Sequence, residues 1–193
     1  MPELRGGHRR RTGAGNTDCD AVHHVQSSRG IALAARRPAL LFWTLTVGLI
    51  GIDQVTKAMV RARLNPAESI ELFRDVLYLT HVRNTGAAFG LMPGGRTLFI
   101  ATSTLVLICI VVYLHRMRPS ARWLVVALGL VAAGAAGNLI DRSLTGRVTD
   151  FVDFSLIHFP VFNVADSAIV IGVGMLVVWI LFGPEPGAEP DES

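Results

Sequence analysis

The chain has 193 residues, of which 51% are hydrophobic and 17% are charged, with a formal net charge of +3. This composition favours a small polytopic membrane protein over a soluble domain. Cys19 lies in a polar tail and Cys109 in an apolar stretch, which excludes a disulfide framework. The six histidines and two cysteines lack metal-ligand spacing, and no phosphate-binding glycine loop is present. We therefore expect no metal, cofactor or nucleic-acid partner.

Residues 1–37 are predicted to be a disordered, basic cytoplasmic extension. They hold seven arginines against three acids and contain no apolar run before Ile31–Ala35, so they are not typical of a cleavable signal. The next stretch, Pro38–Ile52, is uncharged and, continued to Val60, is long enough to cross a bilayer as a helix. Asp53 and Lys57 follow in the i, i+4 spacing that favours a helical ion pair.

The connection from Asn65 to Arg96 is too long for a simple turn. Within it, Ser69–Phe73 and Val76–Val82 alternate enough to predict two short strands. Asn84 and Gly86 then fall in a predicted turn. We expect this segment to form a small extracytoplasmic β element on the membrane surface, between the first and second spans.

Three further stretches of 18 residues carry no charged side chain: Thr97–Leu114, Trp123–Ile140 and Ser167–Pro184. Each reaches the length of about 17 residues that a spanning helix needs at minimum. The second of these stretches is rich in glycine and alanine, which let helices approach closely in lipid, so this helix should be central to the bundle. The predicted fold is an all-α integral membrane protein with four transmembrane helices over residues 38–182, followed by an acidic cytoplasmic tail, residues 183–193.

The arginines predict the orientation of these spans. Arg36 and Arg37 precede the first span, and three more arginines fill the short connection between the second and third spans. Basic loops stay on the cytoplasmic side, so both termini should be cytoplasmic. Residues 59–96 and 141–166 should then lie on the extracytoplasmic side of the membrane.

Two aspartates stand out in this frame. Asp166 borders the last uncharged stretch, and Asp150 lies in the connection that leads into it. Ionised acids at a bilayer need compensation, so they are candidates for function. Two carboxylates at one site can share a proton, so that one acts as a base on water while the other acts as an acid. We therefore predict that Asp150 and Asp166 form a catalytic pair.

Structural interpretations of the acids remain open. Asn163 and Asp166 have the spacing of a helix N-cap, and Asp150 could be a solvated loop residue. Asp53 has Lys57 as a local partner, and Asp141 has Arg142 beside it and Asn138 one turn earlier, which would make both acids structural. Asp153, three residues after Asp150, has no such argument for or against a catalytic role and stays an alternative.

Other function classes fit less well. A Ser-Lys dyad would need Lys57, which the ion pair with Asp53 already occupies, and no nucleophile elbow is present. A transporter or proton relay could use Asp53, Asp141, Asp150 and Asp166, but it would place acids at mid-membrane rather than near one outer face. A purely structural tetraspan assembly factor would leave these acids unexplained.

Five motifs, in order along the chain, resemble those of lipoprotein signal peptidase, also called signal peptidase II. The motifs fall at the ends of the four predicted spans, and the resemblance as a whole covers roughly residues 38–182. The motifs are Asp53-Gln-x-Thr-Lys57, Arg83-Asn-Thr-Gly-Ala-Ala-Phe89, Gly137-Asn-Leu-Ile-Asp-Arg142, Gly146-x-Val-x-Asp-Phe151 and Phe162-Asn-Val-Ala-Asp-Ser167.

The resemblance implies an aspartic endopeptidase of the bacterial inner membrane, active at the extracytoplasmic face. It would remove signal peptides from diacylglyceryl-modified prolipoproteins by cutting before the lipidated cysteine, and globomycin would block its cleft. The catalytic pair would again be Asp150 and Asp166. Thr149 replaces a usual aliphatic residue, with little expected effect. Substrate-binding or supporting positions would be Asp53, Lys57, Asn84, Gly86, Asn138, Asp141, Arg142, Asn163 and Ala165.

Overall fold

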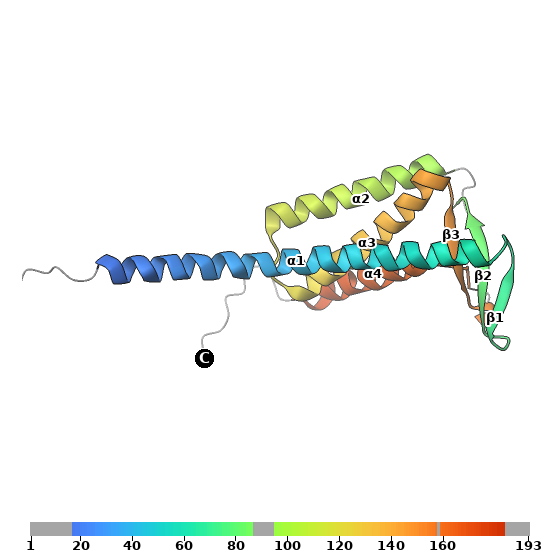
Figure 1. Cartoon of the computed structure of the whole chain (residues 1–193), viewed down its shortest axis with the longest axis horizontal. Helices are drawn as coiled ribbons and strands as arrows, with labels where there is room; N and C mark the ends of the chain where they lie inside the picture. Colours follow the sequence, from blue (N-terminus) through green and yellow to red (C-terminus); the bar gives the residue numbers. More distant parts are fainter. Residues whose placement is uncertain (1–16, 87–94, 158, 184–193) are drawn as a thin grey trace, which may run out of the picture. The chain divides into compact units, whose positions relative to one another are not determined.

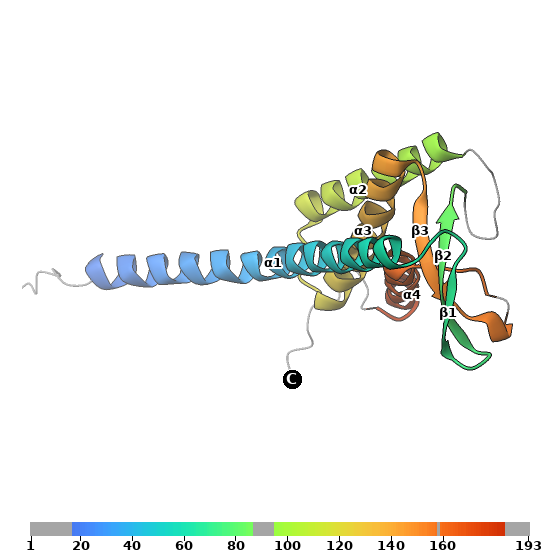
Figure 2. The same ribbon diagram turned by 45° about the vertical axis from the view of Figure 1, so that its right-hand side comes forward.

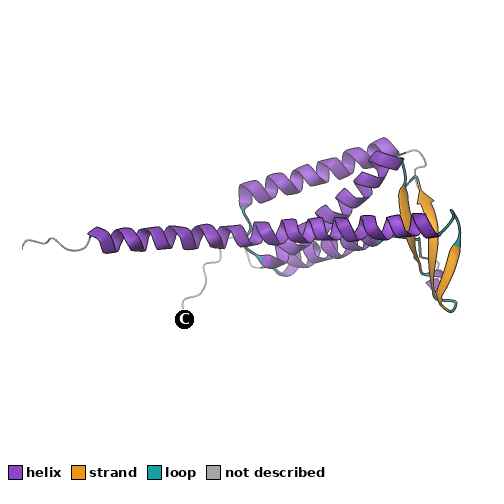
Figure 3. Cartoon of the chain, in the orientation of Figure 1, coloured by secondary structure: helices purple, strands orange, loops and turns teal. Residues whose placement is uncertain are grey.

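A computed structural model describes residues 17–86, 95–157 and 159–183; over residues 17–37 only the backbone is described. Its helices are α1 (Thr17–Arg63), α2 (Arg96–Met117), α3 (Arg122–Thr145) and α4 (Val164–Phe182). Its strands are β1 (Ser69–Phe73), β2 (Leu77–Asn84) and β3 (Val148–Asp153), and a short 3-10 helix, η2, covers Ser155–Ile157. Figure 1 shows the elements in chain order, and Figure 3 separates helices from strands by colour.

The four predicted spans are confirmed. Four helical segments among the described residues are long and apolar enough to cross a membrane: Pro38–Arg63, Arg96–Met117, Arg122–Thr145 and Val164–Phe182. Many large apolar side chains on α1, α2 and α4 are exposed, as expected where lipid rather than water surrounds a helix. The chain is therefore a multi-pass membrane protein.

Helix α3 is the central helix, as its small residues predicted. It carries most of the buried helical side chains and packs against both α2 and α4. A Cβ atom added at Gly134 would collide with the backbone oxygen of Ala165 in α4. In the same way, a Cβ at Gly172 would lie 2.8 Å from the backbone oxygen of Ala127. The absence of side chains at these positions lets α3 and α4 approach until their backbones are almost in contact.

The β element contains one more strand than predicted. The two expected strands pair as an antiparallel hairpin, β1–β2, and β3 adds antiparallel to β2 to give the order β1-β2-β3. The predicted β element is therefore present, and it also includes a strand from the connection between α3 and α4 that the sequence did not predict. The first four residues of β3, Val148–Phe151, are buried, so the strand lacks the alternation that identifies half-buried strands.

The sheet lies across one end of the helices (Figure 2). At that end α1 and α3 finish and α2 and α4 begin, so four helix ends meet there. β3 follows α3 directly and leads through η2 into α4. Its residues lie beside the start of α4, where Asn163 bonds to Asp150. The isolated bridge between Val152 and Phe162 fixes this approach.

The N-terminal region differs from the expected disorder over residues 17–37, because α1 begins at Thr17. The stretch contains a single glycine and no proline before Pro38, and extending an existing helix requires no new nucleus. Residues 1–36 form a unit separate from residues 37–193. Residues 1–16 and the predicted tail after Gly183 lie outside the described residues.

Because α3 and α4 approach so closely, adding one methyl group between them should lower the stability of the protein markedly. Gly134→Ala should lower the free energy of unfolding by about 1–3 kcal/mol, because the new Cβ would collide with the Ala165 backbone oxygen, which cannot turn away, and with the Ile169 side chain. Gly174→Ala, on α4, is the matched control, since no atom lies within 4 Å of its added Cβ. Thermal unfolding in detergent measures both, and equal midpoints for the two variants would contradict this packing.

Candidate active site

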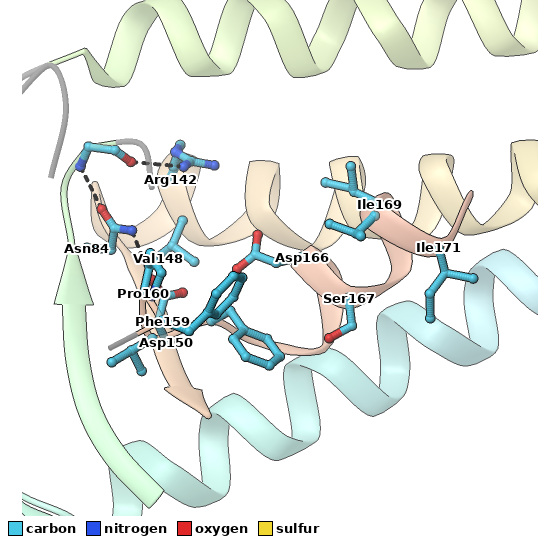
Figure 4. A pocket seen from close by; sticks show the side chains of 14 residues that line it. Asn84, Arg142, Val148, Asp150, Phe159, Pro160, Asp166, Ser167, Ile169 and Ile171 are labelled. Carbon is cyan, nitrogen blue, oxygen red and sulfur yellow. Dashed lines mark hydrogen bonds between the residues drawn. The ribbon is translucent and has the colours of Figure 1, made fainter. Parts of the chain in front are cut away.

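Asp150 and Asp166 line the same cavity, although different elements carry them. Asp150 lies in the third position of β3, and Asp166 in the first turn of α4. The cavity has a volume of about 490 Å³, and Figure 4 shows both carboxylates on its wall. Its lining combines a few polar groups with many apolar ones: Asn84, Gly86, Arg142, Val148, Asp150, Phe159, Pro160, Val161, Phe162, Asp166, Ser167, Ile169, Val170 and Ile171.

Asp166 is held by a helix cap and by a second asparagine. Asn163 caps α4. Its side-chain oxygen accepts from the backbone N–H of Asp166 at 2.9 Å, and its backbone N–H donates to Asp166 Oδ2 at 3.2 Å. The predicted N-cap is therefore confirmed. The other carboxylate oxygen, Oδ1, accepts from Asn138 Nδ2 at 2.7 Å. Although the Asp166 carboxylate takes part in the helix cap, it also lines the cavity.

Asp150 is 2% exposed, so the alternative that it is a solvated loop residue is wrong. Its Oδ1 accepts from Asn163 Nδ2 at 2.6 Å, and its Oδ2 accepts from Asn84 Nδ2 at 2.9 Å. Burial raises the pKa of Asp150 from 3.8 to about 6. The hydrogen bond from Asn84 opposes this rise, whereas the nearby charge of Asp166 adds to it.

Behind the pair lies a buried ion cluster. The Lys57 ammonium, with 0% exposure, lies 2.8 Å from Asp53 Oδ2 and 3.1 Å from Asp141 Oδ2. It also donates to Asn138 Oδ1 at 3.1 Å, and Asn138 in turn bonds to Asp166. Asp53 Oδ1 accepts from the Ala165 amide at 2.9 Å, so Ala165 takes part through its backbone. The predicted Asp53–Lys57 pair is thereby confirmed.

The expected pairing of Asp141 with Arg142 is wrong. Neighbouring residues of a helix point about 100° apart, so the two side chains diverge. Asp141 turns towards Lys57, and Arg142 lines the cavity. There Arg142 Nη2 donates to the Gly86 oxygen at 3.3 Å, and its guanidinium carbon lies 4.9 Å from the centre of the Phe99 ring.

The predicted turn at Asn84 and Gly86 is confirmed, because the Gly86 amide donates to Asn84 Oδ1 at 2.9 Å. The rest of that motif, residues 87–89, lies outside the described residues. Asp153 is not among the residues that line the cavity; its Oδ2 accepts from Thr80 Oγ1 at 2.9 Å. Elsewhere in the described ranges, no group of three or more His, Cys, Asp or Glu side chains has a metal-binding arrangement.

Residues 45–182 match the family model described as "Signal peptidase (SPase) II". The chain belongs to the signal peptidase II family. It is 46% identical over 137 residues to the lipoprotein signal peptidase of Brevibacillus brevis, which covers 71% of this chain and 92% of the relative. The corresponding protein of Halothermothrix orenii is 42% identical over 132 residues, 68% of this chain and 89% of the relative.

A solved bacterial membrane enzyme, determined by the in meso method at 2.3 Å, superposes with a TM-score of 0.72. It is 34% identical to this chain, and the match covers 79% of this chain and 94% of that one. Together with the family model, this similarity shows that the chain is a peptidase with four membrane-spanning helices.

Several residues of the candidate site were not singled out from the sequence. Gln54 donates to Asp53 at 3.1 Å and to the Gly137 oxygen at 3.2 Å, and could have been singled out as the polar neighbour of Asp53. Phe159, Pro160 and Val161, which also line the cavity, belong to none of the five motifs. Their position depends on the bridge to β3, which no local pattern indicates.

The raised pKa of Asp150 has a measurable consequence for stability. At pH values between 3.8 and about 6, the Asp150 carboxyl keeps its proton in the native state, whereas the same group in the unfolded chain, with a pKa of 3.8, has released it. Stability should therefore increase as the pH falls through about 6, by about 1 kcal/mol from pH ~7.5 to ~5. Asp150→Asn should lose this increment, whereas Asp153→Asn should keep it. Unfolding in detergent at the two pH values measures the difference, and an identical pH dependence for all three proteins would contradict the assignment.

Proposed function

We propose that this signal peptidase is an aspartic endopeptidase that uses Asp150 and Asp166 to remove signal peptides from diacylglyceryl-modified prolipoproteins. The cut would fall before the lipidated cysteine. The main support is that two acids, one on β3 and one on α4, line one cavity and share Asn163 as a hydrogen-bond partner. The substrate class follows from the relatives, which carry the name lipoprotein signal peptidase.

The proposed chemistry needs one proton on the pair. The ionised carboxylate takes a proton from a water molecule, and the water oxygen bonds to the scissile carbonyl carbon. The protonated carboxyl gives its proton to the carbonyl oxygen. As the tetrahedral intermediate collapses, the C–N bond breaks and the leaving amine takes up a proton from the pair. The raised pKa of Asp150 supports a shared proton near neutral pH.

Supporting residues would act in two groups. Asp53, Lys57, Asn138, Asp141 and Asn163, together with the amide of Ala165, would hold the carboxylates from behind. Asn84, Gly86 and Arg142 line the cavity itself and would donate to the substrate backbone or to the pair. The apolar walls would hold the signal-peptide segment and keep bulk water from the reacting bond.

A lipid-anchored substrate is confined to the membrane, so the cavity should open near its surface. We assign the protein to the bacterial inner membrane, with residues 1–37, the acidic tail and both termini in the cytoplasm and the sheet outside. Membrane lipid would surround the four spans within residues 38–182. Globomycin would occupy the cavity lined by Asp150 and Asp166.

A transporter or proton relay is less well supported. That function would favour acids in the middle of several spans. Instead Asp53, Asp141, Asp150 and Asp166 gather at the end of the helices where the sheet lies. All four also have partners that form part of a hydrogen-bonded support for the cavity.

Cleavage of a diacylglyceryl-modified prolipoprotein by purified protein tests the proposal. Asp150→Asn and Asp166→Asn keep the size of each side chain and remove the acid, so each should lower the rate about 10²–10⁴-fold. Asp153→Asn, on the same strand, should cleave at nearly the wild-type rate. Thermal unfolding and globomycin binding show whether each variant is folded. If the folded Asp150→Asn variant still cleaved, the proposed catalytic pair would be wrong. If the wild-type protein did not cleave, the proposed substrate would be wrong.

Cysteine labelling tests the orientation. In a variant without Cys19 and Cys109, Asp75→Cys places a thiol between β1 and β2, and Arg118→Cys places one between α2 and α3. A membrane-impermeant maleimide added to spheroplasts should label Asp75→Cys at once and Arg118→Cys only after permeabilisation. The reverse pattern would invert the topology and place the cavity on the cytoplasmic side.

A further inference from the structure

Arg61 and Thr149 form a contact on the far side of β3 from the cavity. Arg61 lies in the last turn of α1, and its Nη1 donates to Thr149 Oγ1 at 3.1 Å. Thr149 is 4% exposed and immediately precedes Asp150 in β3. Thr149 does not line the cavity, as expected because successive strand residues face opposite sides of the sheet.

A second bond holds the same residue. The backbone amide of Thr149 donates to Asp141 Oδ2 at 3.3 Å, and Arg61 Nη1 lies 3.7 Å from Asp141 Oδ1. Thr149 is thus bonded through both its side chain and its backbone. Because residues 149 and 150 share a peptide bond, a displacement of Thr149 displaces the Asp150 carboxylate as well.

Charge explains why an arginine suits this place. Asp53 and Asp141 are both buried beside Lys57, so two carboxylates face one ammonium. A buried charge without compensation is strongly unfavourable. Arg61 brings a second positive charge to Asp141 while its side chain stays 37% exposed. Its guanidinium can bond to the carboxylate and the hydroxyl together, since it carries several donors in one plane.

We propose that Arg61 and Thr149 are positioning residues that hold β3, and with it Asp150, in register with Asp166. The inference rests on the proposed function of that pair. The family resemblance leads one to expect an aliphatic residue at position 149, and its replacement by threonine was expected to have little effect. In this chain the Thr149 hydroxyl is buried and bonded to a cation, so it links α1 to the strand that carries Asp150.

The test measures kcat and KM for lipoprotein cleavage in Thr149→Val, Arg61→Met and the double variant. Valine keeps the branched shape and removes the hydroxyl. Each single change should lower kcat about five- to tenfold and leave KM within about twofold, because the acid is misplaced while the substrate cavity is intact. The double variant should be about as slow as the slower single variant, since both changes remove one contact.

Three controls separate positioning from a general loss of structure. Thr149→Ser keeps the hydroxyl and Arg61→Lys keeps the charge, so each should recover most of the lost kcat. Arg63→Met removes the other arginine of the same turn, which makes no ion pair or side-chain hydrogen bond with another described residue. It should cleave at the wild-type rate. Rates are compared only between samples with equal folded fractions at the assay temperature.

The outcomes are distinct. If Thr149→Val cleaves at the wild-type rate, or if the two single effects multiply in the double variant, Arg61 and Thr149 do not act together on Asp150. The proposed function would survive that result provided Asp150→Asn remained inactive. If Asp150→Asn itself cleaved the substrate, the proposed catalytic pair would be wrong. Any effect of Thr149→Val on the rate would then have to be attributed to folding.

Discussion

The site depends on one buried ammonium group. Lys57 is the only lysine in the chain, and its side chain is fully buried. Removing such a charge from water is costly unless several partners replace the water. Asp53, Asp141 and Asn138 supply those partners from α1 and α3, and Asp53 also binds the first turn of α4 through the Ala165 amide. Three helices are thereby fixed at the end where the cavity forms.

Neutral amides connect this cluster to the two carboxylates. Asn138 contacts Lys57 and Asp166, and Asn163 contacts Asp150 while capping α4. An amide positions a carboxylate without placing a full positive charge against it. A direct lysine or arginine contact would have lowered the pKa of that carboxylate much further. The arrangement therefore fixes the geometry of the pair while the pKa of Asp150 stays raised.

The close approach of α3 and α4 is a second requirement of the same site. Gly137 faces the Asp53 carboxylate, where an added Cβ would lie 2.6 Å from Oδ2. Gly134, one turn earlier, lets the Ala165 backbone come close to α3. Small residues thus serve the chemistry as well as the packing, because they bring the N-terminus of α4, with Asp166, within reach of Asn138.

The sequence by itself determined the four spans, the first hairpin, the helix cap at Asn163 and the Asp53–Lys57 pair. Each is a local pattern: an uncharged run, an alternation, or a spacing of three or four residues. The third strand was missed because Val148–Phe151 is buried on both faces, and a strand that is buried on both faces shows no alternation.

Only the tertiary structure decided which partners the acids have. Asp141 has Lys57 rather than the adjacent Arg142, and Asp150 is bonded by Asn84 and Asn163 rather than exposed to water. These contacts join residues far apart in the chain, and they depend on how closely the helices pack. A sequence records which residues can bond, whereas packing determines which of them come within about 3 Å of one another.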